Sequence, residues 1–166
     1  MTPMRGRTLT AGLLGAALLL AGCPSAYQRT YDQRTQQLEQ QQRADTAAAE
    51  AAHAQAQKYA AVVYFAVGSA AIDADSQREI TWFVQQMQPY PQAIIEVQGF
   101  ADDTGGAPTN VQLSQQRAAN VAAALTAQGI AAPRIAPQGF GDQYPAASNV
   151  SARGRRNNRR VEVTVR

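Results

Sequence analysis

The sequence predicts an α/β fold of the α+β kind, a two-layer sandwich whose helices pack on one face of a small mixed sheet. Three features of residues 59–166 predict it. Short β-branched runs alternate with two longer segments whose apolar residues recur at helical spacing. Glycine or proline follows almost every segment. The last seven residues alternate valine with polar residues, as a half-buried strand does. The order β-α-β-α-β-(α)-β favours two layers around one core.

The domain is expected to begin near residue 59 with a strand over 61–67, which reads AVVYFAV. A helix N-terminus follows, and its signal is Asp73, Asp75 and Ser76. The predicted helix has one apolar stripe at i, i+3, i+4 and i+7, formed by Ile80, Phe83, Val84 and Met87. Pro89 and Pro91 end it, because proline cannot continue a helix.

A second strand is predicted over 93–98, which reads AIIEVQ and is closed by Gly99. The next helix is expected from about 109 to 128, with Gly129 at its end. Its inner face would carry Leu113, Val121 and Leu125.

A short third strand is predicted over 134–138 and is broken by Gly139 and Gly141. Residues 142–157 read as a loop with room for one helical turn. The final strand covers 160–166, and its buried face is expected to carry Val161, Val163 and Val165.

The first 22 residues have the pattern of a secretory signal peptide. The segment before residue 9 carries Arg5 and Arg7 and no acid, and residues 9–20 are almost wholly apolar. That apolar run is too short to span a bilayer as a helix, which needs about 20 residues.

The tetrad Leu20-Ala21-Gly22-Cys23 resembles the bacterial lipobox, whose cysteine is acylated before the signal is removed. Cys23 is the only cysteine in the chain, so we expect it to carry the lipid; a free thiol behind an ordinary signal peptide is the alternative. Residue 24 is Pro and not the Asp that retains such lipoproteins in the inner membrane. The resemblance therefore implies an outer-membrane, periplasm-facing lipoprotein.

Residues 23–58 are expected to form a polar tether. Gln and Ala dominate this segment, and Leu38 is its one large aliphatic residue, so it cannot build a core of its own. Its residue types favour partial helix, but no sustained heptad supports a coiled coil.

Composition excludes several classes of protein. One Cys and one His cannot form a disulfide framework or a Cys/His zinc site. The net charge is +3, and removal of residues 1–22 takes Arg5 and Arg7 with it. Since five of the remaining basic residues lie between 153 and 160, the rest of the chain is acidic. A globally basic nucleic-acid binder is therefore not expected.

Three motifs in register carry a family resemblance. The first is GFADDTG at 99–105, and the second is Asn110-x-x-Leu113-Ser114-x-x-Arg117-Ala118. The third is a closing segment with Gly139, Gly141, Pro145, Asn149, Gly154-Arg155 and Asn158-Arg159-Arg160-Val161. Together they resemble the OmpA-type carboxy-terminal domain, which is also found in Pal and MotB, over residues 60–166. The resemblance implies noncovalent binding of peptidoglycan through the diaminopimelate of the stem peptide.

The resemblance also implies roles for particular residues. The ligand-binding set would be Asp102, Arg117, Asp103, Thr104, Phe100 and Asn110. A structural set would be Gly99, Leu113, Ser114, Asn158, Arg159 and Arg160. Phe100 replaces the usual His or Tyr, and Ala66 and Gly68 stand where many relatives carry Asp. Acidic support from the loop after the first strand is therefore missing.

Asp102 and Arg117 suit this ligand for a physical reason. Diaminopimelate presents an ammonium and a carboxylate on one carbon. A site that binds it therefore needs an anion and a cation a few ångströms apart. The fork of Arg117 can hold a carboxylate by two hydrogen bonds, and Asp102 can take the ammonium. A structural salt bridge between the two side chains is the alternative, and the pair is expected to face each other in either case.

Other functions are less well supported. The arginines between 153 and 160 could bind phosphates, but few aromatic residues lie among them to stack on bases. No nucleophile elbow, zinc-protease motif or P-loop is present. The adjacent Asp102 and Asp103 could in principle act on glycans, although neighbours in a turn usually point apart.

The sequence therefore predicts a binding protein without enzymatic activity or cofactor. It would be an outer-membrane lipoprotein that tethers that membrane to peptidoglycan. A Pal-like subunit of a larger envelope complex, such as a Tol-Pal or secretion machine, is the alternative. Its partners would be peptidoglycan, outer-membrane lipid through acylated Cys23 and envelope proteins, with no nucleic acid.

Overall fold

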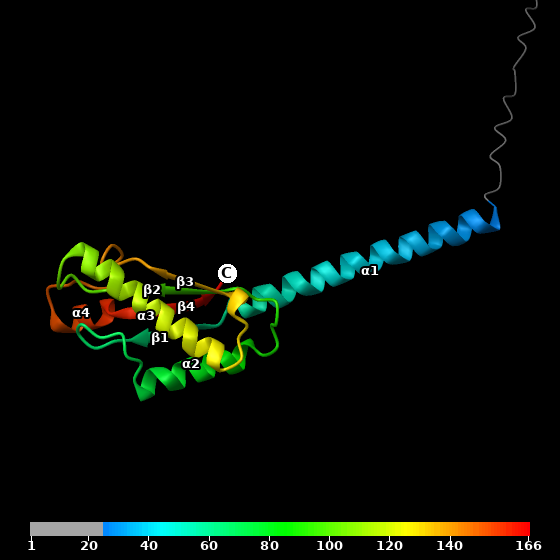
Figure 1. Ribbon diagram of the computed structural model, residues 1–166. Helices are drawn as coiled ribbons and strands as arrows, with labels where there is room; N and C mark the ends of the chain where they lie inside the picture. The colour runs from blue at the N-terminus through cyan, green and yellow to red at the C-terminus, as the bar shows by residue number, and fades with distance from the viewer. Residues whose placement is uncertain (1–24) are drawn as a thin grey trace, which may run out of the picture. The chain divides into compact units, whose positions relative to one another are not determined.

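The computed structural model describes residues 25–166, so the predicted signal peptide and Cys23 lie outside the described residues (Figure 1). The chain divides into two units, one ending at Gln42 and one comprising Arg43–Arg166. The second unit contains the last turns of the first helix and every later element. None of the helices in residues 25–166 is both long enough and apolar enough to cross a bilayer.

The predicted tether is helical over almost its whole length, where only partial helix was expected. Helix α1 spans Ala26–Ala56, and Ser25 Oγ accepts a hydrogen bond from Gln28 N at its start. Ala, Gln, Glu and Arg have a high helix propensity, so a continuous helix can form here without tertiary contacts. Every α1 side chain before Ala56 is exposed, whereas Ala56 is buried in the core of the second unit.

A four-stranded mixed sheet lies at the centre of the second unit, as predicted. Its strands are β1 (Ala60–Tyr64), β2 (Ile95–Gly99), β3 (Ile135–Gly139) and β4 (Arg160–Val165), in the order β1-β4-β2-β3. Strand β4 is antiparallel to both β1 and β2, while β2 and β3 are parallel. The carboxy-terminal strand thus lies inside the sheet and places the end of the chain between the two earlier strands (Figure 1).

Alternate residues of β1, β2 and β4 are buried on one face of the sheet. Helices α2 (Ala74–Met87) and α3 (Ala107–Ala127) contact each other and cover that face. The strand residues of this core are Ala61, Val63, Ile95, Val97, Val161, Val163 and Val165. All four residues of the predicted α2 stripe are in it, which confirms the helical periodicity.

The ends of α2 and α3 agree with the sequence signals. One residue predicted for the inner face of α3, Leu113, does not pack in the core. Asp73 caps α2 by accepting a hydrogen bond from Ser76 N, and Gly129 has a φ of 101° just after α3. Val121 and Leu125 are buried as predicted, but Leu113 is only half-buried and lies outside the core.

The segments on either side of β3 contain more helix than the single turn that the sequence predicted. A 3-10 turn, η1 (Ala132–Arg134), precedes β3, and α4 spans Ala152–Asn158. Asn158 accepts a hydrogen bond from Ala147 N and donates to Ala147 O and to Asn149 Oδ1. These bonds hold the preceding loop against α4, so that the chain enters β4 at a defined point.

Candidate functional site

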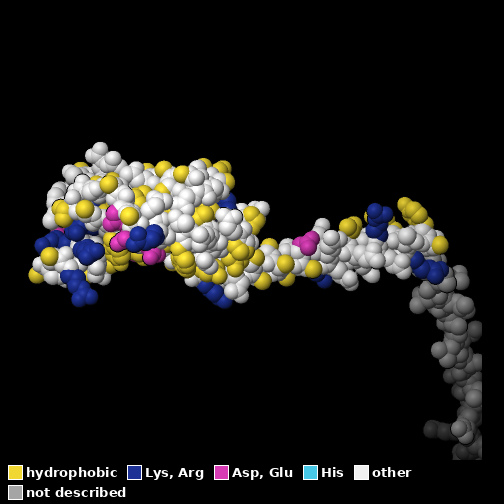
Figure 2. Space-filling view, turned by 90° about the horizontal axis from the view of Figure 1, so that it is seen from below, with side chains coloured by type: hydrophobic (Ala, Val, Ile, Leu, Met, Phe, Trp, Pro, Cys, Tyr) yellow, Lys and Arg dark blue, Asp and Glu magenta, His cyan; other side chains and the backbone are white. Residues whose placement is uncertain are grey.

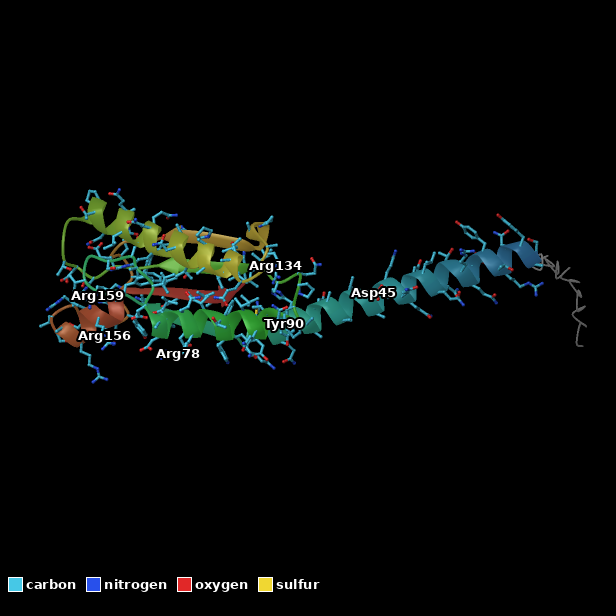
Figure 3. The ribbon with its side chains drawn as sticks, turned by 60° about the horizontal axis from the view of Figure 1, so that its bottom comes forward. Asp45, Arg78, Tyr90, Arg134, Arg156 and Arg159 are labelled. Atoms are coloured by element: carbon cyan, nitrogen blue, oxygen red, sulfur yellow. The ribbon has the colours of Figure 1, made fainter. Side chains whose placement is uncertain are left out.

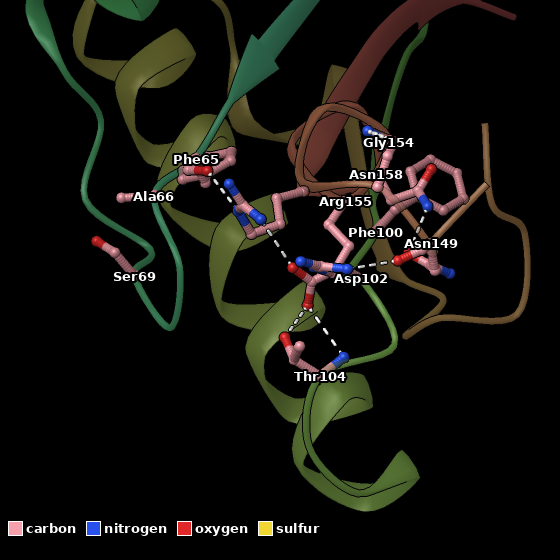
Figure 4. Close-up of polar contacts among 12 residues, drawn as sticks. Phe65, Ala66, Ser69, Phe100, Asp102, Thr104, Asn149, Gly154, Arg155 and Asn158 are labelled. Carbon is pink, nitrogen blue, oxygen red and sulfur yellow. Dashed lines mark hydrogen bonds and ion pairs between the residues drawn. The ribbon is translucent and has the colours of Figure 1, made fainter. Parts of the chain in front are cut away.

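Asp102 is a buried carboxylate in the loop that follows β2. Its Oδ1 accepts hydrogen bonds from the main-chain N–H and the hydroxyl of Thr104, and its Oδ2 accepts one from Arg159 Nη1 at 2.8 Å (Figure 4). Burial opposes ionisation, but the hydrogen bonds from Thr104 and Arg159 outweigh it and hold the pKa of Asp102 below its ordinary value. Asp102 is therefore an anion at neutral pH.

Arg117 is fully buried under the loop between β1 and α2. Its guanidinium donates from Nε to Ser69 O at 2.8 Å, from Nη1 to Phe100 O at 3.0 Å and from Nη2 to Ala66 O at 3.1 Å. Burial lowers the pKa of Arg117 to about 10, so the side chain is still protonated at pH 7. Arg117 thus joins α3 to two loops, and all three of its hydrogen bonds end on main-chain carbonyl groups.

A glycine allows α3 to come this close to β2. A Cβ on Gly99 would overlap the carbonyl oxygen of Ser114, and it would lie 3.3 Å from Ala118 Cβ. Only glycine fits at such a contact between backbones. Its effect is to bring the α3 turn that carries Arg117 against Phe100 O.

The ion pair of the site differs from the predicted one. Asp102 pairs with Arg159 and not with Arg117, and both charges of that pair are buried. Arg159 also donates from Nε to Phe65 O at 3.0 Å, and its own carbonyl accepts from Phe65 N at 2.9 Å. The β1–β4 register therefore places Arg159 beside Asp102, while Arg117 reaches the same loop only through Phe100 O.

Asn110 and Ser114 lie on the same buried face of α3 as Arg117, nearer the start of the helix. Asn110 is buried and donates to Asp142 Oδ2 at 3.0 Å. Ser114 Oγ donates to Val111 O and accepts from Gly141 N, each at 2.8 Å. Both side chains tie α3 to the loop after β3. The structure thus places Asn110 beside Asp142 and Ser114 beside Gly141, and the roles expected for the two residues stay predictions.

Phe100 is buried but lies outside the core cluster that α2 and α3 cover. Its ring stacks on Phe140 with centroids 5.5 Å apart, and the guanidinium of Arg160 lies 4.0 Å from its centroid. Arg160 also pairs with Glu162 at 2.6 Å. Phe100 therefore contributes its carbonyl group to the site, through Arg117, while its ring serves packing.

The arginine run does not form one surface. Arg159 and Arg160 are buried and paired, and Arg155 Nη1 donates to Asn149 O and Val150 O. Arg153 and Arg156 are exposed, and Arg156 lines a groove with Asp73 and Asp75. Figure 2 shows basic side chains with acidic ones among them, and Figure 3 places Arg156 and Arg159 at the same end of the domain.

The structure therefore brings together Asp102, Thr104, Arg117 and Arg159, around the main chain of 65–69 and 100–104. Asp103 is exposed next to this group. Arg159 was predicted to be structural, and its pairing with Asp102 was missed; the Asn158-Arg159-Arg160 motif was the only signal for it. Within residues 25–166 there is no group of three or more His, Cys, Asp or Glu side chains that could hold a metal ion.

The amino-acid sequence is similar to several known proteins. It is 43% identical over 103 residues to a probable lipoprotein, YiaD, of Escherichia coli, with 62% of this chain and 47% of that protein covered. It is 39% identical over 98 residues to the peptidoglycan-binding protein ArfA of Mycobacterium bovis, with 59% and 30% covered. This chain thus spans less than half the length of either relative.

Solved structures share the fold. The peptidoglycan-associated lipoprotein of Burkholderia pseudomallei superposes with a TM-score of 0.61 at 26% identity, covering 64% of this chain and 90% of that one. The cell wall anchor of the T6SS from Pseudomonas aeruginosa has a TM-score of 0.57 at 33% identity, covering 64% and 79%. The model of the OmpA family matches residues 64–159, which include Asp102, Arg117 and Arg159. On this match, the chain belongs to the OmpA family.

Proposed function

We propose that the domain binds peptidoglycan noncovalently by holding the diaminopimelate of the stem peptide, and that acylated Cys23 ties it to the outer membrane. The observation that carries the proposal is the buried, ionised Asp102, which pairs with Arg159 and follows the Phe100 carbonyl group that Arg117 holds. A relative that is 39% identical to this chain over 98 residues is named as a peptidoglycan-binding protein. The probable-lipoprotein relative supports the anchor.

The ligand has one charge of each sign on a single carbon, and the site offers both complements. The ligand ammonium would hydrogen-bond to the carboxylate of Asp102, which already accepts from neutral and charged donors. The ligand carboxylate would accept from guanidinium N–H groups. Arg117 uses three of the five N–H donors of a guanidinium on main-chain carbonyls, which leaves two.

Arg159 is a second donor for that carboxylate. Its Nε and Nη1 are engaged, whereas Nη2 has no hydrogen-bond partner within residues 25–166. Arg159 also lies closer to the surface than Arg117, whose side chain is covered by the loop at 66–69. A carboxylate would therefore meet Arg159 first and reach Arg117 when that loop moves aside.

Retention on the wall would come from repetition. A single contact between a zwitterion and a few charged groups is weak, because exposed charge pairs contribute only about 0–1 kcal/mol each. A domain held beside a polymer of identical stem peptides rebinds at a high effective concentration. The 31-residue α1, about 46 Å long at 1.5 Å per residue, is a spacer of suitable length between lipid and wall.

A subunit of a larger envelope assembly is the second candidate. The observation that favours it is the structural similarity to the peptidoglycan-associated lipoprotein and to the T6SS cell wall anchor. The exposed faces of α1 would then serve as a docking surface. Deletion of residues 25–42 followed by crosslinking in cells separates the two, since a passive spacer loses no partner.

Sedimentation with purified sacculi tests the wall-binding proposal. The lipidated protein in detergent should co-sediment, and Asp102→Ala should stay in the supernatant. Glu79→Ala, which removes an exposed acid outside the predicted ligand-binding set, should behave as wild type. Co-sedimentation of Asp102→Ala at the wild-type level would contradict the site. Release of soluble muropeptides during the incubation would show a hydrolase, whereas a binder leaves the sacculi intact.

A further inference from the structure

The charged groups buried in the site do not balance. Asp102, Arg117 and Arg159 are 4%, 0% and 9% exposed, so all three are removed from bulk water. They comprise one anion and two cations, and the anion is already paired with Arg159. Three main-chain carbonyl groups accept hydrogen bonds from Arg117. No carboxylate in residues 25–166 lies within 4 Å of its guanidinium. An uncompensated buried charge is unfavourable.

No neighbouring side chain supplies the missing anion. The loop over Arg117, residues 66–71, reads AVGSAA and contains no acid. Asp103 is exposed and forms no ion pair within the described part of the chain. Arg160 belongs to the other face of the sheet, where Glu162 neutralises it. The site therefore carries an excess of one positive charge before any ligand binds.

We propose that this excess makes the site select diaminopimelate whose side-chain carboxylate is free, and reject the form in which that carboxylate is amidated. The inference rests on the proposed function, because it concerns the ligand of the same site. The free form brings an ammonium and a carboxylate, so its carboxylate neutralises the surplus guanidinium while Asp102 holds the ammonium. The amidated form brings only the ammonium, which adds a second positive charge to a site that already has one too many.

Residue 66 is the position that sets this selectivity. Ala66 O lies 3.1 Å from Arg117 Nη2, and the Ala66 side chain is exposed, so there is room for a larger residue (Figure 4). Aspartate at this position would place a carboxylate next to the surplus guanidinium and remove the need for one on the ligand. Ala71 lies in the same loop and is exposed, but it has no contact with either arginine, so it serves as the matched control.

The test compares two synthetic stem tetrapeptides, Ala-γ-Glu-diaminopimelate-Ala, with the side-chain carboxylate of diaminopimelate free or amidated and its other carboxyl group in the peptide bond. Each is titrated by calorimetry into the full lipidated chain in detergent. The free peptide should bind at least about tenfold more tightly than the amide, as expected for a charge-assisted pair. Ala66→Asp should reduce this preference severalfold by improving binding of the amide, while Ala71→Asp should keep it.

The outcomes separate this inference from the proposed function. Equal binding of both peptides to the wild type would overturn the selectivity and leave peptidoglycan binding standing. Binding of neither peptide, with sacculi also left unbound, would overturn both. An unchanged preference in Ala66→Asp, with the fold intact by circular dichroism, would contradict the role of residue 66.

Discussion

Arg117 connects more of the site than any other side chain described here, because its three hydrogen bonds end on three separate carbonyl groups. Ala66 O and Ser69 O belong to the β1–α2 loop, and Phe100 O precedes Asp102 by two residues. The Arg117 guanidinium also lies 5.1 Å from the centroid of the Phe65 ring. A charged side chain fills the place of a core residue here, and the carbonyl dipoles make its burial tolerable.

Replacement of Arg117 by Ala should therefore lower the free energy of unfolding by about 3–5 kcal/mol, because buried carbonyls lose their donors and a cavity remains. Arg117→Lys should recover part of the loss, since an ammonium donates from one point and cannot reach all three acceptors. Urea denaturation followed by circular dichroism measures both. Equal stability of wild type and Arg117→Ala would mean that water replaces the guanidinium without cost.

Asp102 should give the domain an acid-sensitive contribution to stability. Its folded pKa is depressed below the unfolded value of about 3.9, so the ionised form stabilises the fold above that pH. The contribution is lost as the pH falls through the lower folded pKa. Asp102→Asn should thus be less stable than wild type at pH 7, and the difference should shrink below about pH 4.

Urea denaturation of wild type and Asp102→Asn at a series of pH values measures this difference. The exposed Asp103→Asn is the control, and its unfolding free energy should follow that of the wild type at every pH. A gap between wild type and Asp102→Asn that stays constant down to pH 2 would show that the ion pair with Arg159 contributes nothing to folding.

At the scale of elements, the contact between β2 and α3 decides where the site forms. Gly99 lets the backbone of α3 approach β2, and Gly139 does the same from β3, where a Cβ would overlap the main chain of Gln115. Helix α3 is thereby held against two parallel strands along its first half. Arg117 and Ser114 sit on that half and use the close approach to reach the loops beyond the strands.

Gly99→Ala should consequently displace α3 and destabilise the domain by about 1–3 kcal/mol, because backbone atoms cannot yield as a flexible side chain can. Gly106→Ala is the matched control: its φ is −88°, and its nearest contact is Pro108 Cδ at 3.8 Å. Thermal unfolding followed by circular dichroism distinguishes them. A Gly99→Ala protein as stable as the control would show that the two backbones can separate freely.

For the whole molecule, the two units differ in what their residues contribute to folding. No side chain of α1 is buried before Ala56, so residues 25–42 add helix but no core. Ala56 belongs to the core, and close to it Tyr59 packs against Trp82 and Tyr90 at centroid distances of 6.3 and 6.1 Å. The end of α1 is therefore part of the domain, whereas its beginning contributes no buried residue.

Deletion of residues 25–42 should leave the melting temperature of the domain unchanged, because no burial is lost. Ala56→Asp should lower the free energy of unfolding by about 2–5 kcal/mol, since it buries an unpaired charge. Ala54→Asp, an exposed neighbour, should have no such effect. Differential scanning calorimetry compares the three proteins, and a shared loss in all of them would assign the whole of α1 to the cooperative unit.

Local patterns in the sequence were sufficient for the element order, the mixed two-layer fold and the residues of the core stripe. Alternation in 160–166 and the i, i+3, i+4, i+7 spacing in α2 each arise within one element, so periodicity reveals them. The motif at 99–105 and the helix motif at 110–118 also led to the family, and hence to Asp102 and Arg117. The length of α4 was underestimated, because its stability depends on Asn158 bonding back to the loop.

The sequence alone determined which segments are strands and which are helices. Its motifs also indicated that Asp102 and Arg117 belong to one region of the fold. Only the tertiary structure decided which charges meet. Asp102 and Arg159 are 57 residues apart, and they pair because the register of β1 with β4 joins Phe65 to Arg159 beside the loop after β2. Strand register depends on the packing of all four strands together, so no local pattern encodes the exchange of Arg117 for Arg159.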